Sequence, residues 1–165
     1  MPTSISMPMD IWLLRHAVAE DRAPSGRDPD RELTPEGLQR ARAVARGLAA
    51  LEPGIVRILS SPYRRALQTA EPAARALGIE VSPSQALEPE SDPGEILREI
   101  QAGAGHVLLV GHQPHLGSML GLLVAGSGVE IPMKKASVAR VTLDGQRSGR
   151  LRAYLPAAVL ERLGG

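Results

Sequence analysis

Short apolar segments alternate along this chain with segments that carry helix signals, and this alternation restricts the possible folds more than any other feature. We expect strands at residues 10–14, 55–59, 79–82, 106–110, 137–143 and 150–155. We expect helices at residues 35–52, 62–77 and 93–100, after Pro114, and at the C-terminal end. This order, β-α-β-α-β-α-β-α-β-β-α, predicts an α/β protein. The expected architecture is a three-layer α/β/α sandwich with a mostly parallel central sheet, in which residues 1–165 form one domain.

The ends of several predicted elements are marked by residues with clear local preferences. Thr34 before Pro35 predicts a helix N-terminus, since threonine caps the first turn and proline is tolerated at the first helical position. Gly78 is placed to end the next helix, and residues 144–145 (Asp-Gly) to form the turn of a hairpin. Residues 19–32 are charged, contain proline and glycine and show no periodicity, which predicts a mobile loop.

Polar side chains follow three of the predicted strands. They are Arg15-His16, Ser60-Ser61 with Arg64-Arg65, and Gly111-His112. Because the carboxyl ends of parallel strands meet at one edge of a sheet, we expect these residues to lie close together. The helices that start after Ser61 and Pro114 would direct their positive dipole ends at the same place.

Histidines and arginines held together in this way are suited to phosphoryl transfer. A neutral imidazole is a nucleophile that forms covalent intermediates. Neighbouring guanidinium groups lower the pKa of an imidazole and so keep it neutral at physiological pH. The same groups bind phosphate oxygens in pairs and stabilise the charge that spreads over them in the transition state. We therefore expect a phosphoryl-transfer site that needs no metal ion or other cofactor.

The composition excludes several other classes of protein. The chain has no cysteine, which excludes disulfides, thiol nucleophiles and cysteine-ligated metal centres. Nineteen basic and eighteen acidic residues leave a net charge of +1, and aromatic residues make up only 2% of the chain, so we expect neither nucleic acid nor a membrane surface as a partner. No apolar run is long enough to span a bilayer, and residues 1–8 read as a flexible extension rather than a signal peptide. A cytoplasmic location is the expectation.

Other polar residues have plainer interpretations. His106 opens a strand and is expected to be structural, His115 is expected at the surface, and a metal site built on His112 and His115 lacks a third ligand. The arginines of residues 19–32 and the pair Lys134-Lys135 are expected to be solvated, with one loop arginine a candidate for the site entrance.

Four segments of the sequence resemble motifs of the histidine phosphatase superfamily. They are residues 14–17 (LRHA), 31–37 (RELTPEG), 60–70 (SSPYRRALQTA) and 110–114 (VGHQP). They occur in the order of that family and at suitable spacing, although Ala17 stands where the family signature has glycine. Within the superfamily, whose fold is phosphoglycerate mutase-like, the short chain and its Gly-His-Gln-Pro segment resemble the SixA-type phosphohistidine phosphatases.

The resemblance implies a role for each residue at the strand ends. The implied roles are the nucleophile for His16, phosphate binding for Arg15 and Arg65, the second imidazole of the pocket for His112, and a place at the pocket mouth for Arg31. Arg65 is chosen over Arg64 because the family's arginine lies four positions after the serine of its motif, here Ser61. Arg64 is then expected to face solvent.

Glu88 is the one candidate with two opposed interpretations. Mutases and phosphomonoesterases of the superfamily carry an acidic residue after the third strand, which protonates an alkoxide leaving group. Glu88 lies at about that place, so either it is a general acid or it takes no part in the chemistry. We favour the second, because an imidazole leaves phosphorus more readily than an alkoxide and needs less help from an acid.

The resemblance and the residues together predict a phosphatase that forms a phosphohistidine at His16 and acts on phosphohistidine-containing proteins. One alternative is an enzyme for phosphorylated small molecules, a phosphomonoesterase or a phosphoglycerate mutase, with Glu88 as its acid. Another is a non-catalytic module that binds phosphorylated partners. A chain this short leaves no room for the insertions that enclose small substrates in larger relatives, which favours a protein substrate. We expect a monomer or a weak dimer.

Overall fold

The computed structural model, which describes residues 7–145 and 148–165, follows the predicted order of elements. The strands are β1 (Met9–Arg15), β2 (Ile55–Ser60), β3 (Val81–Pro83), β4 (His106–Gly111), β5 (Val138–Leu143) and β6 (Arg150–Leu155). The α-helices are α1 (Pro35–Ala50), α2 (Arg64–Leu77), α3 (Pro93–Gln101), α4 (His115–Ala125) and α5 (Ala157–Leu163). No helix among the described residues is long and apolar enough to cross a membrane. Of the predicted N-terminal extension, residues 1–6 lie outside the described part of the chain.

The six strands form one sheet in the order β3-β2-β4-β1-β5-β6. Strands β3, β2, β4 and β1 run parallel, whereas β5 is antiparallel to both of its neighbours. The register places Arg15 of β1 opposite Gly111 of β4, and Ser60 of β2 opposite Val110 of β4. The strand ends that carry the candidate residues are therefore adjacent, with β4 in the middle.

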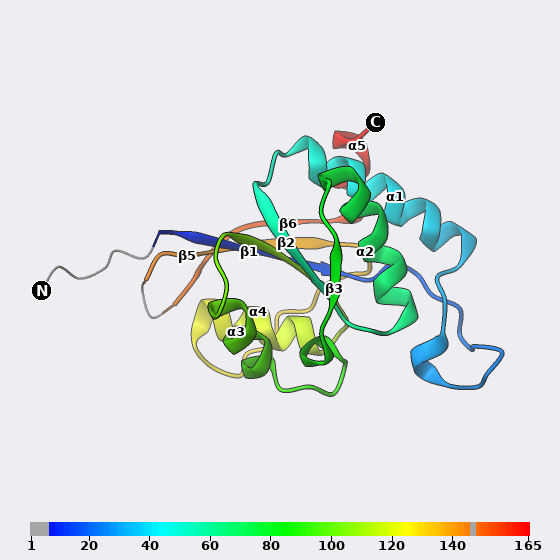
Figure 1. Ribbon diagram of the computed structural model, residues 1–165, viewed down its shortest axis with the longest axis horizontal. Coiled ribbons are helices and arrows are strands. Elements are labelled where there is room, and N and C mark those ends of the chain that lie inside the picture. The colour runs from blue at the N-terminus through cyan, green and yellow to red at the C-terminus, as the bar shows by residue number, and fades with distance from the viewer. Residues whose placement is uncertain (1–6, 146–147) are drawn as a thin grey trace, which may run out of the picture.

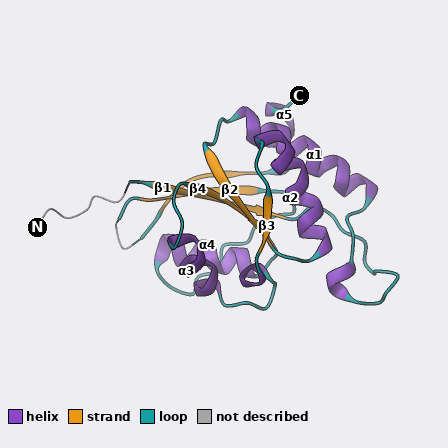
Figure 2. Ribbon diagram, viewed as in Figure 1, coloured by secondary structure: helices purple, strands orange, loops and turns teal. Residues whose placement is uncertain are grey.

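Helices cover both faces of the sheet, with α1, α2 and α5 on one side and α3 and α4 on the other (Figure 1 and Figure 2). Trp12 and Leu14 of β1 are buried in the core beneath the first group, and Ile11 and Leu13 in the core beneath the second. This alternation explains why β1 is apolar at successive positions, since both of its faces are covered. The predicted three-layer sandwich with a mostly parallel sheet is confirmed.

The predicted helix signals act as expected. Thr34 Oγ1 accepts a hydrogen bond from the N–H of Gly37 at 2.9 Å and so caps α1. Asp92 accepts one from the N–H of Gly94 at 2.7 Å at the start of α3. Gly78 ends α2 with a left-handed φ of 69°, a conformation that glycine adopts without strain.

Several element boundaries differ from the prediction by one or two residues, and at both ends of α2 local hydrogen bonds explain the difference. The N–H of Ile79 donates to Ala74 O at 3.0 Å and closes the end of α2, so the β3 ladder begins only at Val81. At the other end of α2, Ser61 Oγ accepts from the N–H of Tyr63 at 3.2 Å. Tyr63 keeps an extended backbone there, and the helix begins after it.

The loop between β1 and α1 is more ordered than its sequence predicts. At its base, Glu20 N–H donates to Glu32 O at 2.8 Å and Ala19 forms an isolated bridge with Leu33. Toward its tip, which projects from the sandwich in Figure 1, Asp28–Asp30 form a 3-10 helix, η1. A second one, η2 (Gln85–Leu87), follows β3. The sequence does not predict either, because a single 3-10 turn has no periodicity to detect.

Candidate active site

The sheet brings the two candidate histidines together. His16 follows β1 and His112 follows β4, and their ring centroids lie 5.1 Å apart with the ring planes tilted by 58°. Both residues are buried, with exposed fractions of 7% for His16 and 1% for His112. A hydrogen bond of 3.0 Å from His16 N to Gly111 O joins the two strand ends. The sheet register therefore sets the relative position of the two rings.

The tautomer of His16 follows from its hydrogen bond. Its Nδ1 lies 2.7 Å from the main-chain oxygen of Ala17. A carbonyl oxygen only accepts hydrogen bonds, so Nδ1 must carry the proton and donate it. In the neutral ring, Nε2 then has no proton and presents a lone pair.

The surroundings of His16 keep its ring neutral. Burial is the main cause that lowers the pKa of His16 to about 4, and the cations Arg65, Arg15 and Lys135 lower it as well. The hydrogen bond to Ala17 O acts in the opposite direction but does not prevail. At neutral pH His16 is therefore an uncharged imidazole with a free Nε2.

His112 is held by a hydroxyl group and an aromatic ring. Its Nε2 lies 2.8 Å from Ser61 Oγ, and the ring of Tyr63 meets it edge-on at 5.2 Å between centroids. Burial, followed by the neighbouring His16 and Arg65, lowers the pKa of His112 to about 2. Its Nδ1 is buried and has no hydrogen-bond partner among the described residues. Buried polar atoms without a partner are uncommon in proteins and call for a functional explanation.

The two adjacent arginines at the start of α2 point in different directions. The side chain of Arg65 is 6% exposed, and its guanidinium carbon lies 5.1 Å from the centroid of the Tyr63 ring. Arg64 is 53% exposed and pairs with Glu32 at 3.0 Å. Since the charge of Arg65 acts on both histidines, the structure places Arg65 and not Arg64 at the site. That Arg65 binds phosphate stays a prediction.

Arg15 occupies the last position of β1 with a half-buried side chain. Its Nη1 donates to Met133 O at 2.8 Å, which fixes the guanidinium, while its Nε is buried without a partner in the part of the chain that the structure describes. Burial lowers the pKa of Arg15, but a guanidinium remains charged at neutral pH. Arg15 thus brings a second positive charge close to His16.

Arg31 and Glu88 are less closely tied to the histidines. Arg31 Nε donates to Glu20 O at 2.7 Å, and its Nη1 donates to Asp28 Oδ1 at 2.8 Å. Glu88 follows η2 and is half-buried; within the described residues its side chain forms no hydrogen bond or ion pair. Burial raises the pKa of Tyr63, and the charge of Glu88 adds to this rise, so Glu88 lies on the Tyr63 side of the site.

His115 is buried, which corrects the prediction that it lies at the surface. It is 2% exposed, and it lies near the start of α3, where Asp92 and Glu95 partly offset the fall in pKa that burial causes. The prediction was wrong because α4 is apolar around most of its circumference and offers no polar stripe to mark an outer face. His106 is structural, as predicted, since its Nδ1 accepts from the N–H of Asp10 at 2.9 Å. No group of histidine and acidic residues in the described ranges could hold a metal ion.

Three further residues act on the site, although no chemical role is predicted for them. Ser61 contacts His112 and lies inside a quoted motif, so its position after a strand was a signal. Lys135 is exposed, as predicted, but its charge lowers the pKa of His16. The N–H of the next residue, Ala136, donates to Arg15 O at 3.0 Å, which holds this segment beside the end of β1. Asp28 binds Arg65, and no local pattern singles it out.

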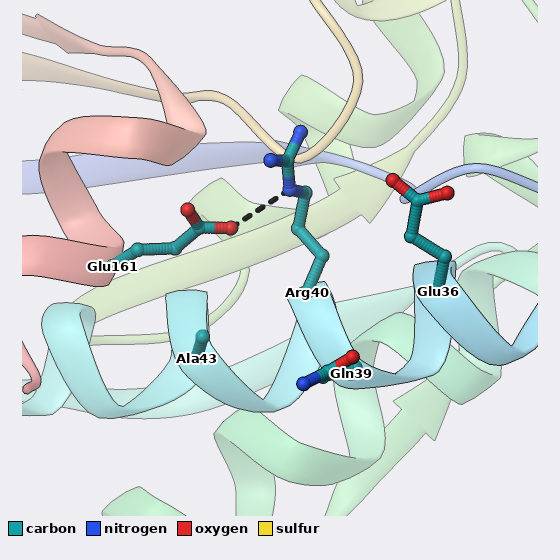
Figure 3. A pocket seen from close by; sticks show the side chains of 5 residues that line it. All are labelled: Glu36, Gln39, Arg40, Ala43 and Glu161. Atoms are coloured by element: carbon teal, nitrogen blue, oxygen red, sulfur yellow. Dashed lines mark hydrogen bonds and ion pairs between the residues drawn. The ribbon is translucent and has the colours of Figure 1, made fainter.

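A separate surface pocket lies between α1 and α5. Its volume is about 350 Å³, and Figure 3 shows the side chains that line it, namely Glu36, Gln39, Arg40, Ala43 and Glu161. Arg40 Nε donates to Glu161 Oε1 at 2.7 Å and closes one side of it. None of the candidate residues lines this pocket, so its chemistry is independent of the histidine site.

The fold and the arrangement of the site define the class of protein. Residues 11–103, more than half of the chain, match the family model of the histidine phosphatase superfamily (branch 1), and the chain belongs to that family. It is a phosphatase with the three-layer fold of that family.

Comparison with individual proteins shows which members of the superfamily this chain is similar to. The phosphohistidine phosphatase SixA of Escherichia coli K12 is 32% identical over 149 residues, which cover 86% of this chain and 89% of that protein. An uncharacterized protein of Picosynechococcus is 37% identical over 150 residues, covering 87% of this chain and 88% of its own. A structure of the protein histidine phosphatase SixA complexed with tungstate superposes with a TM-score of 0.82 at 28% identity, covering 91% of this chain and 98% of that one.

Proposed function

We propose that this phosphatase removes phosphoryl groups from phosphohistidine on proteins through a covalent phosphohistidine at His16, without a metal ion. The observation that carries the proposal is the hydrogen bond from His16 Nδ1 to Ala17 O, which leaves Nε2 unprotonated beside Arg15 and Arg65. The related protein of Escherichia coli is named as a phosphohistidine phosphatase, which supports this class of substrate.

The reaction has two steps. In the first, the lone pair of His16 Nε2 forms a bond to phosphorus while the bond from phosphorus to the substrate imidazole breaks, and that imidazole takes up a proton from solvent. In the second, the oxygen of a water molecule forms a bond to the phosphorus of phospho-His16 and gives one proton to solvent, the bond from phosphorus to Nε2 breaks, and inorganic phosphate leaves while Nε2 regains its lone pair. Arg15 and Arg65 supply the positive charge that stabilises the phosphoryl oxygens in both transition states. These guanidinium groups take the part that a metal ion plays in other phosphatases.

The absence of an α-helical cap among the described residues supports a protein as substrate. Each of the α-helices packs on a face of the sheet, so in the described ranges no helical layer rises over the ends of β1, β2 and β4 (Figure 1). Small phosphorylated molecules are the alternative substrate class.

Replacing Glu88 by glutamine tests the two interpretations of this residue. We expect kcat/KM for a phosphohistidine protein to change less than about threefold, because imidazole is a good leaving group and, among the described residues, the side chain of Glu88 forms no hydrogen bond that orders the site. We expect hydrolysis of p-nitrophenyl phosphate to be slow in both forms. Loss of activity on both substrates in the Glu88→Gln variant, on the order of 100-fold, would instead make Glu88 the general acid.

The pH dependence of activity follows from the need for a neutral His16. Because the pKa of His16 is about 4, kcat/KM should be level from neutral pH down to about pH 5 and decline as the pH falls through 4. A decline centred near 6.5, the ordinary pKa of histidine, would show that His16 titrates as an exposed residue.

The free energy of unfolding should depend on pH between about 4 and 6.5, which is a higher range than that of the activity. The unfolded chain binds a proton at His16 below its ordinary pKa of 6.5, whereas the folded chain does so only below about 4. The unfolded state therefore binds more protons between these values, and the contribution of His16 makes the free energy of unfolding fall as the pH is lowered from 6.5 to 4. Urea unfolding at several pH values, compared between wild type and a His16→Ala variant, measures this contribution. An equal pH slope in the two proteins over that window would contradict it.

The proposed substrate class is tested by offering two substrates in the presence of EDTA. One is a phosphocarrier protein that bears a phosphohistidine, and the other is p-nitrophenyl phosphate. Rapid loss of phosphohistidine with slow ester hydrolysis is the expected result. The reverse preference would make the chain a small-molecule phosphatase. Loss of activity in EDTA that a divalent ion restores would overturn the claim of metal independence.

A further inference from the structure

Asp28 joins Arg65 of the site and Arg31 of its own loop in a single bridge. Its Oδ2 accepts a hydrogen bond from Arg65 Nη2 at 3.1 Å, and its main-chain oxygen accepts one from Arg65 Nη1 at 2.9 Å. Its other carboxylate oxygen, Oδ1, accepts from Arg31 Nη1 at 2.8 Å. One residue of the loop between β1 and α1 therefore fixes a buried arginine of α2 and a second arginine of its own loop.

The side chains of Arg65, Arg31 and Asp28 differ in burial, and this difference shows that Arg65 needs Asp28 as a partner for its charge. The exposed fraction is 6% for Arg65, 27% for Arg31 and 53% for Asp28. A guanidinium as buried as that of Arg65 is costly unless a partner compensates its charge, and two guanidinium groups held close together repel each other. The hydrogen bond from Arg31, followed by that from Arg65, lowers the pKa of Asp28, so its carboxylate is ionised at neutral pH and offsets both charges.

The segment that carries Asp28 is itself attached to α2. The N–H of Leu33 donates to Gln68 Oε1 at 2.7 Å, and Arg64 donates to Glu32 Oε1 at 3.0 Å. Within the loop, the N–H of Arg31 donates to Asp28 O at 3.2 Å and closes η1. Residues 28–33 therefore lie along the first turns of α2, which gives Asp28 a defined place relative to Arg65.

We propose that Asp28 is a positioning residue that orients Arg65 toward the phosphoryl group and holds Arg31 beside it. This inference rests on the proposed function. A guanidinium has five N–H hydrogens, and Asp28 takes one from each terminal nitrogen of Arg65. The remaining hydrogens are available to phosphoryl oxygens, and their directions are set before substrate arrives. Preorganised donors of this kind stabilise a transition state without the cost of reorientation.

The test compares Asp28→Asn with Asp30→Asn, a matched change in the same 3-10 helix. Asparagine keeps the shape of aspartate and one of its acceptors, so the loop should remain folded. Asp30 bonds to Ser25 Oγ at 2.8 Å and lies 3.8 Å from Arg27, both outside the phosphoryl site, so its variant serves as the control. The probe is tungstate, an oxyanion that mimics phosphate, and its dissociation constant is measured by calorimetry alongside KM and kcat for the phosphohistidine protein.

We expect Asp28→Asn to weaken tungstate binding and to raise KM by about tenfold, the size of one charge-assisted hydrogen bond, while Asp30→Asn stays within about twofold of wild type. Restoration of tight binding by Asp28→Glu would support an orienting carboxylate. Equal or tighter tungstate binding in Asp28→Asn would overturn the proposal, because Asp28 would then compete with the phosphoryl group for Arg65. Equal losses in both variants would overturn it too, since the loop as a whole would be responsible.

The binding measurement separates this inference from the proposed function. If wild type binds tungstate but leaves phosphohistidine intact, the proposed substrate is wrong, and the comparison of Asp28→Asn with Asp30→Asn still decides the role of Asp28. Absence of tungstate binding by wild type would overturn the role given to Asp28, because no oriented oxyanion site would exist.

Discussion

Replacing His16 by alanine is expected to abolish phosphatase turnover and to remove any phosphorylated enzyme intermediate. The loss of kcat should be on the order of 10⁴-fold or more, as for other enzymes that lose a nucleophile. The physical reason is that the other imidazole of the site, His112, follows β4 and does not occupy the position of the nucleophile at the end of β1. The Nε2 of His112 is occupied by Ser61 Oγ at 2.8 Å, and His112 is packed against Tyr63 rather than placed at the end of β1.

The measurement for His16→Ala is transfer of labelled phosphate from a phosphohistidine protein, followed by separation under alkaline conditions that preserve phosphohistidine. Circular dichroism and urea unfolding check that the variant folds. His106→Gln is a suitable control, since His106 is a structural residue that accepts a hydrogen bond from Asp10 N. Label retained on folded His16→Ala would overturn the assignment of the nucleophile.

Replacing Arg65 by alanine is expected to produce the second largest loss. A buried guanidinium that contacts the transferring group contributes roughly 2–4 kcal/mol to transition-state stabilisation, which corresponds to a fall in kcat/KM of about 30- to 1000-fold. Arg65→Lys should recover only part of this, because an ammonium group lacks the planar fork that binds two oxygens. The free energy of unfolding should change as well, since Asp28 loses one of its two partners and Tyr63 loses the guanidinium packed on its ring.

Arg64→Ala is the matched control for Arg65→Ala. Arg64 precedes Arg65 in the same helix turn, but it is 53% exposed and pairs with Glu32 on the loop. An exposed ion pair of this kind contributes little, so kcat/KM for Arg64→Ala should stay within about threefold of wild type. If Arg64→Ala were the more damaging of the two changes, the choice of Arg65 would be wrong.

The parts of the fold that could be predicted are those with strong local patterns. The continuous apolar runs of β1 and β4 indicate strands covered on both faces, and the polar ends of β1, β2 and β4 indicate where side chains converge. The threonine before α1 and the glycine after α2 have preferences that depend only on the neighbouring residues of the chain. These features need no knowledge of distant contacts, and the structure agrees with them.

The parts that could not be predicted depend on contacts between distant segments. Asp28 acts through Arg65, 37 positions away in the chain, and nothing in its neighbourhood distinguishes it from Asp30. His115 is buried because α4 is covered on most sides, which its own sequence does not reveal. The hydrogen bond from His16 Nδ1 to Ala17 O joins neighbouring residues, but the tautomer of His16 follows only from the three-dimensional position of the ring.

The most direct test of the whole account is to locate the phosphoryl group during turnover. Wild-type enzyme is mixed with a phosphocarrier protein bearing labelled phosphohistidine in EDTA, quenched with alkali within milliseconds, and digested for peptide mapping. The account predicts transient label on the peptide that contains His16, lost as inorganic phosphate appears. Label on His112 instead, or release of phosphate with no labelled enzyme at any time, would contradict it.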